Sequence, residues 1–243
     1  MKIYTLVLLC SLWFGISTIG FGQGAILFQH FGSADPTAEG FSLNIGNGTS
    51  VGPATNDFGM NAWKTASTSG GSAIFDYQQL LTPQQQAQVT ASDWMLSVTL
   101  RMVQPSGSIG YPEVLFDTGS QYFSLDFGTD GNGDPLVRAG TSSLSPVYTI
   151  TGAGSSYNNY ELVFNSVGNV ASLWVDGVDR IDNIGGHSSS SSPGFYWGTG
   201  QGALTPFQDY WNLVSLSVPE PSSVGVLLLG SGVLFYLRRK RRH

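Results

Sequence analysis

The feature that most constrains the fold of this chain is an alternation of apolar and polar side chains in several short segments. In Trp94–Val103, every second position from the first tryptophan is apolar, while Ser97, Thr99 and Arg101 occupy positions between them. A period of two places successive side chains on opposite faces, so such a segment is typical of a half-buried β-strand. Similar alternation occurs in Tyr122–Phe127, Tyr160–Asn165, Ala171–Asp176 and Trp211–Val218.

Turn-forming sequences separate these predicted strands. Asp176-Gly177 is a signal for a tight hairpin, and stretches rich in Gly, Asp, Asn and Ser lie at 128–135 and 185–194. Many short alternating segments divided by such turns predict an all-β fold, an antiparallel sandwich of two sheets.

One segment, residues 81–94, does not alternate with a period of two. Thr82 can act as the N-cap of a helix, Pro83 suits the first helical position, and Gln85 stands where a capping box needs a Gln or Glu. We therefore expect a short helix of one or two turns on the surface of the sandwich.

The charge of the chain is distributed unevenly. The whole chain carries a formal charge of −6, but five of its ten basic residues lie at the C-terminal end. Between Gly24 and Val218, four basic residues stand against 15 acidic ones, a net charge of −11. Such a surface repels phosphate backbones, which excludes nucleic acid as a partner. It is compatible with divalent cations or with uncharged glycans.

The N-terminal segment has the layout of a secretory signal peptide over residues 1–22. Lys2 provides the positive charge, an apolar stretch follows from Ile3 to Ile19, and Gly20 and Gly22 are the small residues before a cleavage site. The alternative is an N-terminal membrane helix that is retained. Cleavage leaves a mature chain without cysteine, because Cys10 is the only one.

The C-terminal segment predicts a separate hydrophobic helix. Val224–Leu237 is an uncharged apolar run of 14 residues. As a helix it covers roughly 21 Å, which flanking serines and snorkelling basic side chains extend toward the ~30 Å of a bilayer core. A basic cluster follows it, and the positive-inside rule then predicts a cytoplasmic C-terminus. The cluster consists of Arg238, Arg239, Lys240, Arg241 and Arg242.

Residues 219–243 together resemble the PEP-CTERM sorting signal of bacteria. Pro219, Glu220 and Pro221 match the signature, and the apolar helix and the basic stop follow in the same order. The resemblance implies that an exosortase recognises the motif, removes the helix and passes the protein to the cell surface or extracellular matrix. The alternative is a permanent membrane anchor that is not processed.

Residues 23–218 form the predicted domain, which resembles a laminin-G-like or concanavalin A-like jelly roll. The resemblance rests on Ser92–Met102, Tyr122–Gly128, Tyr160–Arg180 and Phe195–Val218. We expect residues 24–90 to supply the opening strands and loops. Jelly rolls of this kind include glycan-binding modules and glycosidases, so the resemblance implies exopolysaccharide as a partner.

The acidic residues and histidines do not form a recognisable catalytic motif. Retaining glycosidases need two carboxyl groups about 5–5.5 Å apart, whereas Glu113 and Asp117 would lie about 13 Å apart along a strand. The histidines of the predicted domain, His30 and His187, have no G-x-S-x-G motif beside them, and we expect both to be solvated or packed under loops. We predict no catalytic residues and a protein that is not an enzyme; an unrecognised glycosidase is the alternative.

One short loop sequence could bind calcium. Asp130, Asn132 and Asp134 occupy the first, third and fifth positions of an oxygen-ligand loop, but Pro135 replaces the glycine of position 6 and Thr141 the glutamate of position 12. A hairpin turn uses the same residue types. Calcium is thus an alternative to a plain turn, and no other cofactor is predicted.

Two aromatic residues are candidates for stacking on sugar rings. Trp174 should face outward because its strand neighbours are apolar, and Tyr122 should project opposite the apolar face of its strand. The alternatives are that each ring packs beneath a loop, and that the protein is a structural matrix component without a specific ligand.

Overall fold

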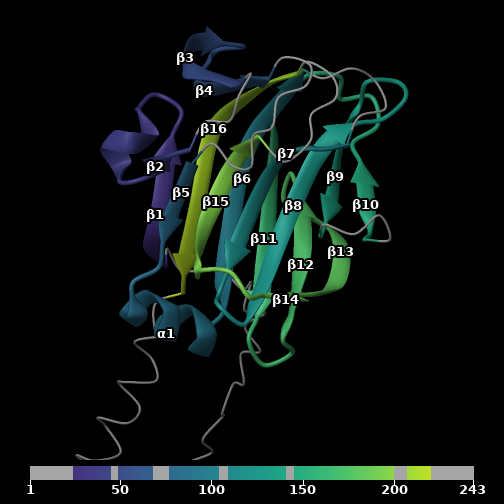
Figure 1. Cartoon of the computed structure of the whole chain (residues 1–243). Coiled ribbons are helices and arrows are strands. Elements are labelled where there is room, and N and C mark those ends of the chain that lie inside the picture. The colour runs from purple at the N-terminus through teal and green to yellow at the C-terminus, as the bar shows by residue number, and fades with distance from the viewer. Residues whose placement is uncertain are drawn as a thin grey trace, which may run out of the picture.

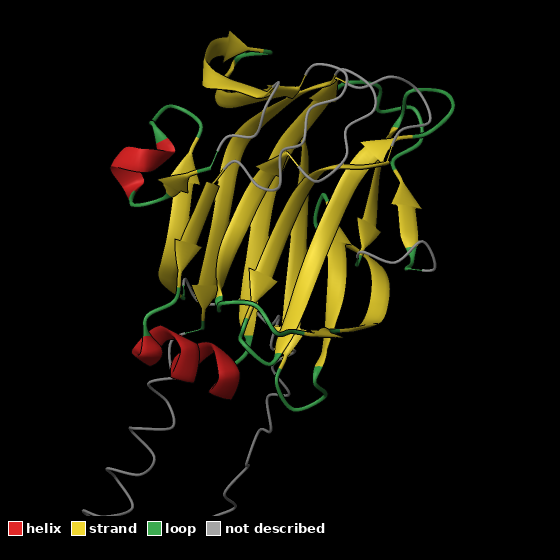
Figure 2. Ribbon diagram, in the orientation of Figure 1, coloured by secondary structure: helices red, strands yellow, loops and turns green. Residues whose placement is uncertain are grey.

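Two antiparallel sheets stack face to face and form a β-sandwich, with the helical segments at its edges (Figures 1 and 2). The predicted antiparallel sandwich is therefore confirmed. The computed structural model describes residues 24–44, 49–67, 77–103, 109–140, 145–199 and 207–219. The predicted signal peptide and the predicted C-terminal helix lie outside the described residues.

The first sheet has the strand order β13-β12-β11-β6-β16-β4-β3, with β1 also paired to β16. In chain order its strands are β1 (Ala25–Phe31), β3 (Thr49–Asp57), β4 (Met60–Ser67), β6 (Trp94–Val103), β11 (Asn158–Asn165), β12 (Val170–Val175), β13 (Val178–Gly185) and β16 (Phe207–Val218).

The second sheet has the strand order β10-β9-β8-β7-β15-β5-β2, with β14 also paired to β8. In chain order its strands are β2 (Ser42–Leu43), β5 (Tyr77–Leu80), β7 (Ile109–Asp117), β8 (Gln121–Thr129), β9 (Pro135–Ala139), β10 (Val147–Thr149), β14 (His187–Ser188) and β15 (Gly194–Thr199).

The core is rich in aromatic rings that come from both sheets. Trp94 on β6 stacks on Phe164 of β11 and meets the rings of Phe116 and Phe123, on β7 and β8, edge to face. Stacked and edge-to-face rings of this kind contribute beyond the apolar area that they bury. Four of the predicted alternating segments lie within β6, β8, β11 and β16, and the fifth overlaps β12. Their apolar faces lie in the core, and on β8 part of the polar face, Ser124 and Asp126, is buried as well.

The local signals for the turn and the helix are also confirmed. Asp176 and Gly177 have φ angles of 50° and 75° and join β12 to β13, as a two-residue primed turn requires. The helix α1 (Pro83–Ala91) starts at the N-cap Thr82, whose hydroxyl accepts from the Gln85 amide while the Gln85 side chain accepts from the Thr82 amide. A 3-10 helix, η1 (Pro36–Glu39), was not predicted.

Strand β16 brings the two ends of the described chain together. It pairs with β4 along Phe207–Trp211 and with β1 along its second half, where Ala25 lies opposite Val218. Gly32 follows β1 at the point where the partner of β16 changes from β4 to β1. A Cβ at this position would stand 2.5 Å from the Ala62 Cα. This close approach accounts for glycine at the junction.

We predict that Thr82→Ala lowers the free energy of unfolding by about 1 kcal/mol, because it removes one partner of the capping box. Urea titration of the purified protein measures this difference. Gln84→Ala, on the exposed side of the same helical turn, is the matched control and should leave the stability nearly unchanged. Equal losses in the two variants would contradict a capping role for Thr82.

Candidate functional site

A buried arginine organises a cluster on the outer face of the first sheet. Arg101 on β6 points away from the core because its neighbours Leu100 and Met102 point into it. Its side chain is only 6% exposed, and it forms a two-pronged ion pair with Asp57, Nε to Oδ2 and Nη2 to Oδ1, both at 2.6 Å. Planar pairing of this kind fixes orientation as well as charge.

The β3–β4 hairpin supplies Asp57 and places an exposed ring beside the arginine. Phe58 and Gly59 form the tip of this hairpin with φ angles of 50° and 82°. A bulky side chain in left-handed backbone costs about 1–2 kcal/mol, and asparagine is the usual residue at this position. The Phe58 ring nevertheless lies 4.7 Å from the Arg101 guanidinium carbon, and the residue is 72% exposed. One face of the ring therefore covers the cation while the other is open to solvent.

Two tyrosines complete the arrangement. The guanidinium carbon lies 4.0 Å from the ring centre of Tyr210 on β16 and 5.9 Å from that of Tyr157. The Tyr157 hydroxyl donates a hydrogen bond of 2.8 Å to Asp57 Oδ2. We call these five residues, Asp57, Phe58, Arg101, Tyr157 and Tyr210, the aromatic–guanidinium cluster.

The electrostatics of the cluster keep it in one protonation state. Burial acts to raise the pKa of Asp57, but hydrogen bonds from Arg101 and Tyr157 outweigh it and hold that pKa below its usual range. Burial acts to lower the pKa of Arg101, and the ion pair with Asp57 raises it overall. Burial and the bond to Asp57 both raise the pKa of Tyr157. At neutral pH the ion pair is therefore charged and the phenol is protonated.

The cluster has the properties of a stacking platform. Its exposed ring is held by a cation beneath it, so binding would cost little side-chain entropy. Sequence reasoning missed it because Arg101 lies 44 residues from Asp57, and Tyr157 lies 100 residues from it. The sequence feature that could have indicated the cluster is Phe58, a bulky residue directly before Gly59 at the tip of the β3–β4 hairpin.

The two aromatic residues predicted to stack on sugars lie on different sheets. Trp174 is on β12 of the first sheet and Tyr122 is on β8 of the second, and both are partly exposed. Tyr122 stacks on His187, with ring centres 5.3 Å apart. The two rings therefore cannot contribute to one platform, and their role in binding stays a prediction.

The three calcium candidates form hydrogen bonds within their own turn and to the loop after β10. Asp130 Oδ1 accepts from the amides of Asn132 and Asp134, and the Asp134 carboxylate accepts from the amides of Gly152 and Gly154. The bond from the Asp134 amide contributes most to lowering the pKa of Asp130. Within the described ranges, no group of three or more His, Cys, Asp or Glu side chains is arranged to hold a metal ion. Calcium binding stays a prediction.

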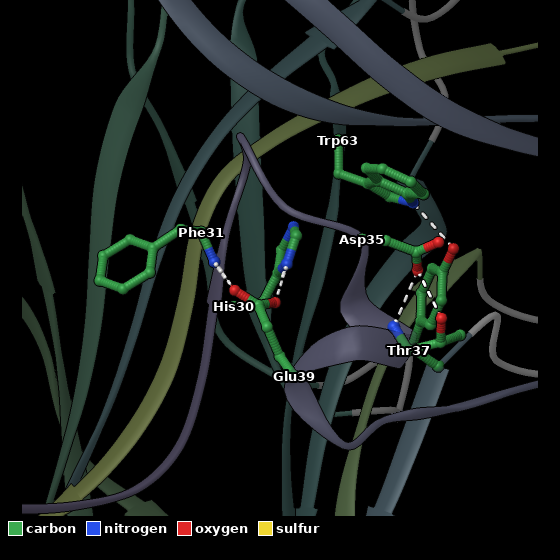
Figure 3. A network of polar contacts seen from close by, with 7 residues as sticks. His30, Phe31, Asp35, Thr37, Glu39 and Trp63 are labelled. Atoms are coloured by element: carbon green, nitrogen blue, oxygen red, sulfur yellow. Dashed lines mark hydrogen bonds and ion pairs between the residues drawn. The ribbon is translucent and has the colours of Figure 1, made fainter.

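His30 is fully buried and holds η1 against β1 (Figure 3). Burial lowers its pKa, although Glu39 acts in the opposite direction, so the neutral ring donates from Nδ1 to Glu39 Oε2 at 2.6 Å. The other Glu39 oxygen accepts from the Phe31 amide. His30 also stacks on Trp197 with ring centres 4.8 Å apart. It lies beside η1 among aromatic rings of the core, and its contacts are structural.

The sorting motif begins where the sandwich ends. β16 ends at Val218 and Pro219 follows it directly, while Glu220, Pro221 and the basic residues lie outside the described residues. In the part of the chain that the structure describes, no helix is both long and apolar enough to cross a membrane.

Comparison with known families identifies the C-terminal segment. Residues 217–242 match the PEP-CTERM protein-sorting motif. The sorting signal predicted from Pro219, Glu220, Pro221 and the following segment is therefore confirmed. The motif implies an exported protein with a C-terminal membrane-anchoring sorting signal that an exosortase processes. No curated protein matches the chain in sequence.

Solved structures share the sandwich fold at very low sequence identity. A carbohydrate esterase from the Shiga toxin-encoding bacteriophage phi24B matches with a TM-score of 0.61 and 10% identity, over 81% of this chain and 100% of that one. A botulinum neurotoxin type C, described as interacting with two ganglioside molecules, matches with a TM-score of 0.55 and 8% identity, over 85% of this chain and 51% of that one. At these identities the likeness shows the fold alone.

We predict that Asp57→Asn lowers the free energy of unfolding by about 3 kcal/mol at pH 7, because it leaves the buried Arg101 without its counter-charge. The folded-state pKa of Asp57 lies below its unfolded value, so its contribution is present above the unfolded pKa and lost as the pH falls through the folded one. The difference between variant and wild type in denaturant titrations should therefore shrink in strong acid.

The control for this variant is Asp179→Asn, which neutralises an exposed acid on β13 that lies near Asp182. Its stability should equal or slightly exceed that of the wild type. A loss of stability in Asp57→Asn no larger than in this control would contradict the structural role of the ion pair.

Proposed function

We propose that this protein is exported, released from its C-terminal helix by an exosortase and displayed at the cell surface or in the extracellular matrix, where it binds polysaccharide. The observation that carries the binding proposal is the aromatic–guanidinium cluster. Its exposed Phe58 ring is held over a buried ion pair, and the Phe58 backbone has a strained, left-handed conformation. A strained residue of this kind is retained where the side chain has a use that outweighs the strain.

The position of the cluster supports presentation of a binding surface away from the membrane. Tyr210 lies near the start of β16 and Val218 at its end, a separation of eight residues or about 26 Å along a strand. In Figure 1 the β3–β4 hairpin is at the top, and β16 runs down toward the end where α1 lies. Before processing, the sorting signal holds the lower end near the membrane, and the cluster faces outward.

The ligand class follows from charge and shape. The body of the domain carries a net charge of −11 between Gly24 and Val218, which disfavours strongly anionic chains. The cluster itself is neutral overall because Asp57 balances Arg101. An uncharged sugar ring presents C–H groups to the open face of Phe58 and hydroxyls to the surrounding polar atoms. We therefore propose an uncharged exopolysaccharide as the ligand.

The fold family, the binding role and the cell-surface fate that the sequence predicts are also part of this proposal. We retain the laminin-G-like or concanavalin A-like jelly roll as the fold family, a binding role rather than catalysis, and cell-surface fate. A sandwich of this kind occurs in a carbohydrate esterase and in a toxin that interacts with gangliosides, which is consistent with a glycan ligand. Release of reducing ends from a bound glycan would favour the glycosidase alternative instead.

We predict that the mature wild-type protein binds an uncharged polysaccharide on a glycan array, and that Phe58→Asn weakens this binding about tenfold, or ~1.4 kcal/mol. Asparagine suits the primed turn, so the variant should fold. Val167→Asn replaces another exposed apolar residue, 96% exposed, in the loop after β11, and should bind like the wild type. Absence of binding to any glycan would favour a structural matrix role.

We predict that the protein recovered from the surface of its host lacks the segment after the PEP motif. Mass spectrometry of the intact protein measures this directly. A Glu220→Ala variant should accumulate with its tail attached if an exosortase reads the motif. A surface protein that still ends at His243 would leave a permanent anchor as the explanation.

A further inference from the structure

The outer face of the second sheet carries a row of charged residues on three neighbouring strands. Glu113 on β7 lies opposite Asp126 on β8, and Asp126 lies opposite Arg138 on β9. Ser124 shares the Asp126 face of β8, two residues away. We call these four residues the polar row. Arg138 donates from Nε and Nη2 to Asp126 Oδ2, at 3.0 and 2.5 Å.

Two buried atoms of the polar row make no hydrogen bond within the described structure. These are the second carboxylate oxygen of Asp126, Oδ1, and the hydroxyl of Ser124. The residues are only 3% and 2% exposed. An unpaired buried polar atom costs folding free energy, and native proteins keep few of them without a functional reason. Glu113 and Arg138 are partly exposed at the edges of the row.

The charge state of the polar row favours a neutral partner. Burial, together with the nearby Asp126 carboxylate, raises the pKa of Glu113 to about 8, with Arg138 acting in the opposite direction. At neutral pH Glu113 is therefore mostly protonated, and the Asp126–Arg138 pair balances itself. The partly exposed edges of the row then offer a carboxylic acid and a guanidinium as donors, and beside them a carboxylate oxygen and a hydroxyl lie buried without a partner. Sugar hydroxyls, which both donate and accept, match this set.

We infer that the polar row is a second site for uncharged glycan, so that the protein binds two glycan segments at once. This rests on the proposed function, because it assumes that the aromatic–guanidinium cluster binds the same class of ligand. The cluster lies on the outer face of the first sheet and the polar row on the outer face of the second. These faces point in opposite directions. One short glycan segment cannot reach both, and the displayed protein therefore cross-links polysaccharide chains.

Ser124→Ala is the most discriminating variant. If the row is only structural, removing an unpaired buried hydroxyl leaves stability unchanged or raises it and has no effect on binding. If the row binds glycan, the same variant is at least as stable as the wild type but loses one binding site. Stability and binding thus change independently, and a folding defect cannot imitate the predicted result.

Isothermal titration calorimetry of the processed protein with maltohexaose, cellohexaose and mannohexaose counts the sites. With a saccharide that binds, we expect two sites in the wild type, one in Ser124→Ala, one in Phe58→Asn and none in the double variant. Dextran and mannan solutions should gain turbidity or viscosity only with proteins that keep both sites. Thr99→Ala, on the outer face of β6, is the matched control and should keep both sites.

Raising the pH provides an independent test of Glu113. The charged groups that act on it are Asp126 on β8 and Arg138 on β9, and the residue opposite it on β15 is Gly198. In the Phe58→Asn variant, which keeps only the polar-row site, binding should weaken at least tenfold between pH 7 and pH 9.5, because Glu113 loses its proton. Glu113→Gln keeps a neutral donor and should bind equally at both values.

The outcomes separate this inference from the proposed function. Two sites in Ser124→Ala, or cross-linking by that variant, would overturn the second site while leaving the first intact. One site in the wild type that Phe58→Asn removes would have the same meaning. No binding by the wild type would overturn both. A wild type with a single site, lost in Ser124→Ala but kept in Phe58→Asn, would assign the only glycan site to the polar row and overturn the proposed role of the cluster.

Discussion

The pairing of β16 is the constraint on which the rest of the sandwich depends. This strand pairs along one edge with β6 and along the other with β4 and then β1, so it joins segments from the start, middle and end of the domain. Trp211, Val214 and Leu216 anchor it in the core. The same strand carries Tyr210 into the aromatic–guanidinium cluster and ends at Val218, directly before the sorting motif. The proposed binding surface and the sorting motif thus lie at opposite ends of one strand.

Much of the architecture could be predicted because its signals are local. The alternation in β6 and β11 fixes which face is buried, and the residues around Thr82 and Asp176 fix the start of the helix and the hairpin turn. These features depend on a few neighbouring residues and on backbone geometry. The order of the strands depends on contacts between distant segments, and the alternation does not encode it.

The candidate sites could not be predicted for the same reason. Asp57 meets Arg101 only because the β3–β4 hairpin lies beside β16 and β16 beside β6. The sequence pairs Glu113 with Asp117 along one strand, whereas the carboxylate next to Glu113 in the fold is that of Asp126 on the neighbouring strand. That pairing depends on the register of β7 and β8, which shifts between Ile109 and Glu113. Trp174 and Tyr122 lie outside the core, as predicted, but on different sheets.

The central proposal is that an exported sandwich binds uncharged glycan through a hairpin tip held over a buried ion pair. The most direct measurement is a nuclear magnetic resonance titration of the isotope-labelled mature protein with the glycan that it binds on an array. We predict that the largest chemical-shift changes include the backbone amides of Phe58 and Gly59 and the Arg101 Nε–H group. Changes confined to Trp174 or to the Asp130–Asp134 turn, or no changes at all, would contradict it.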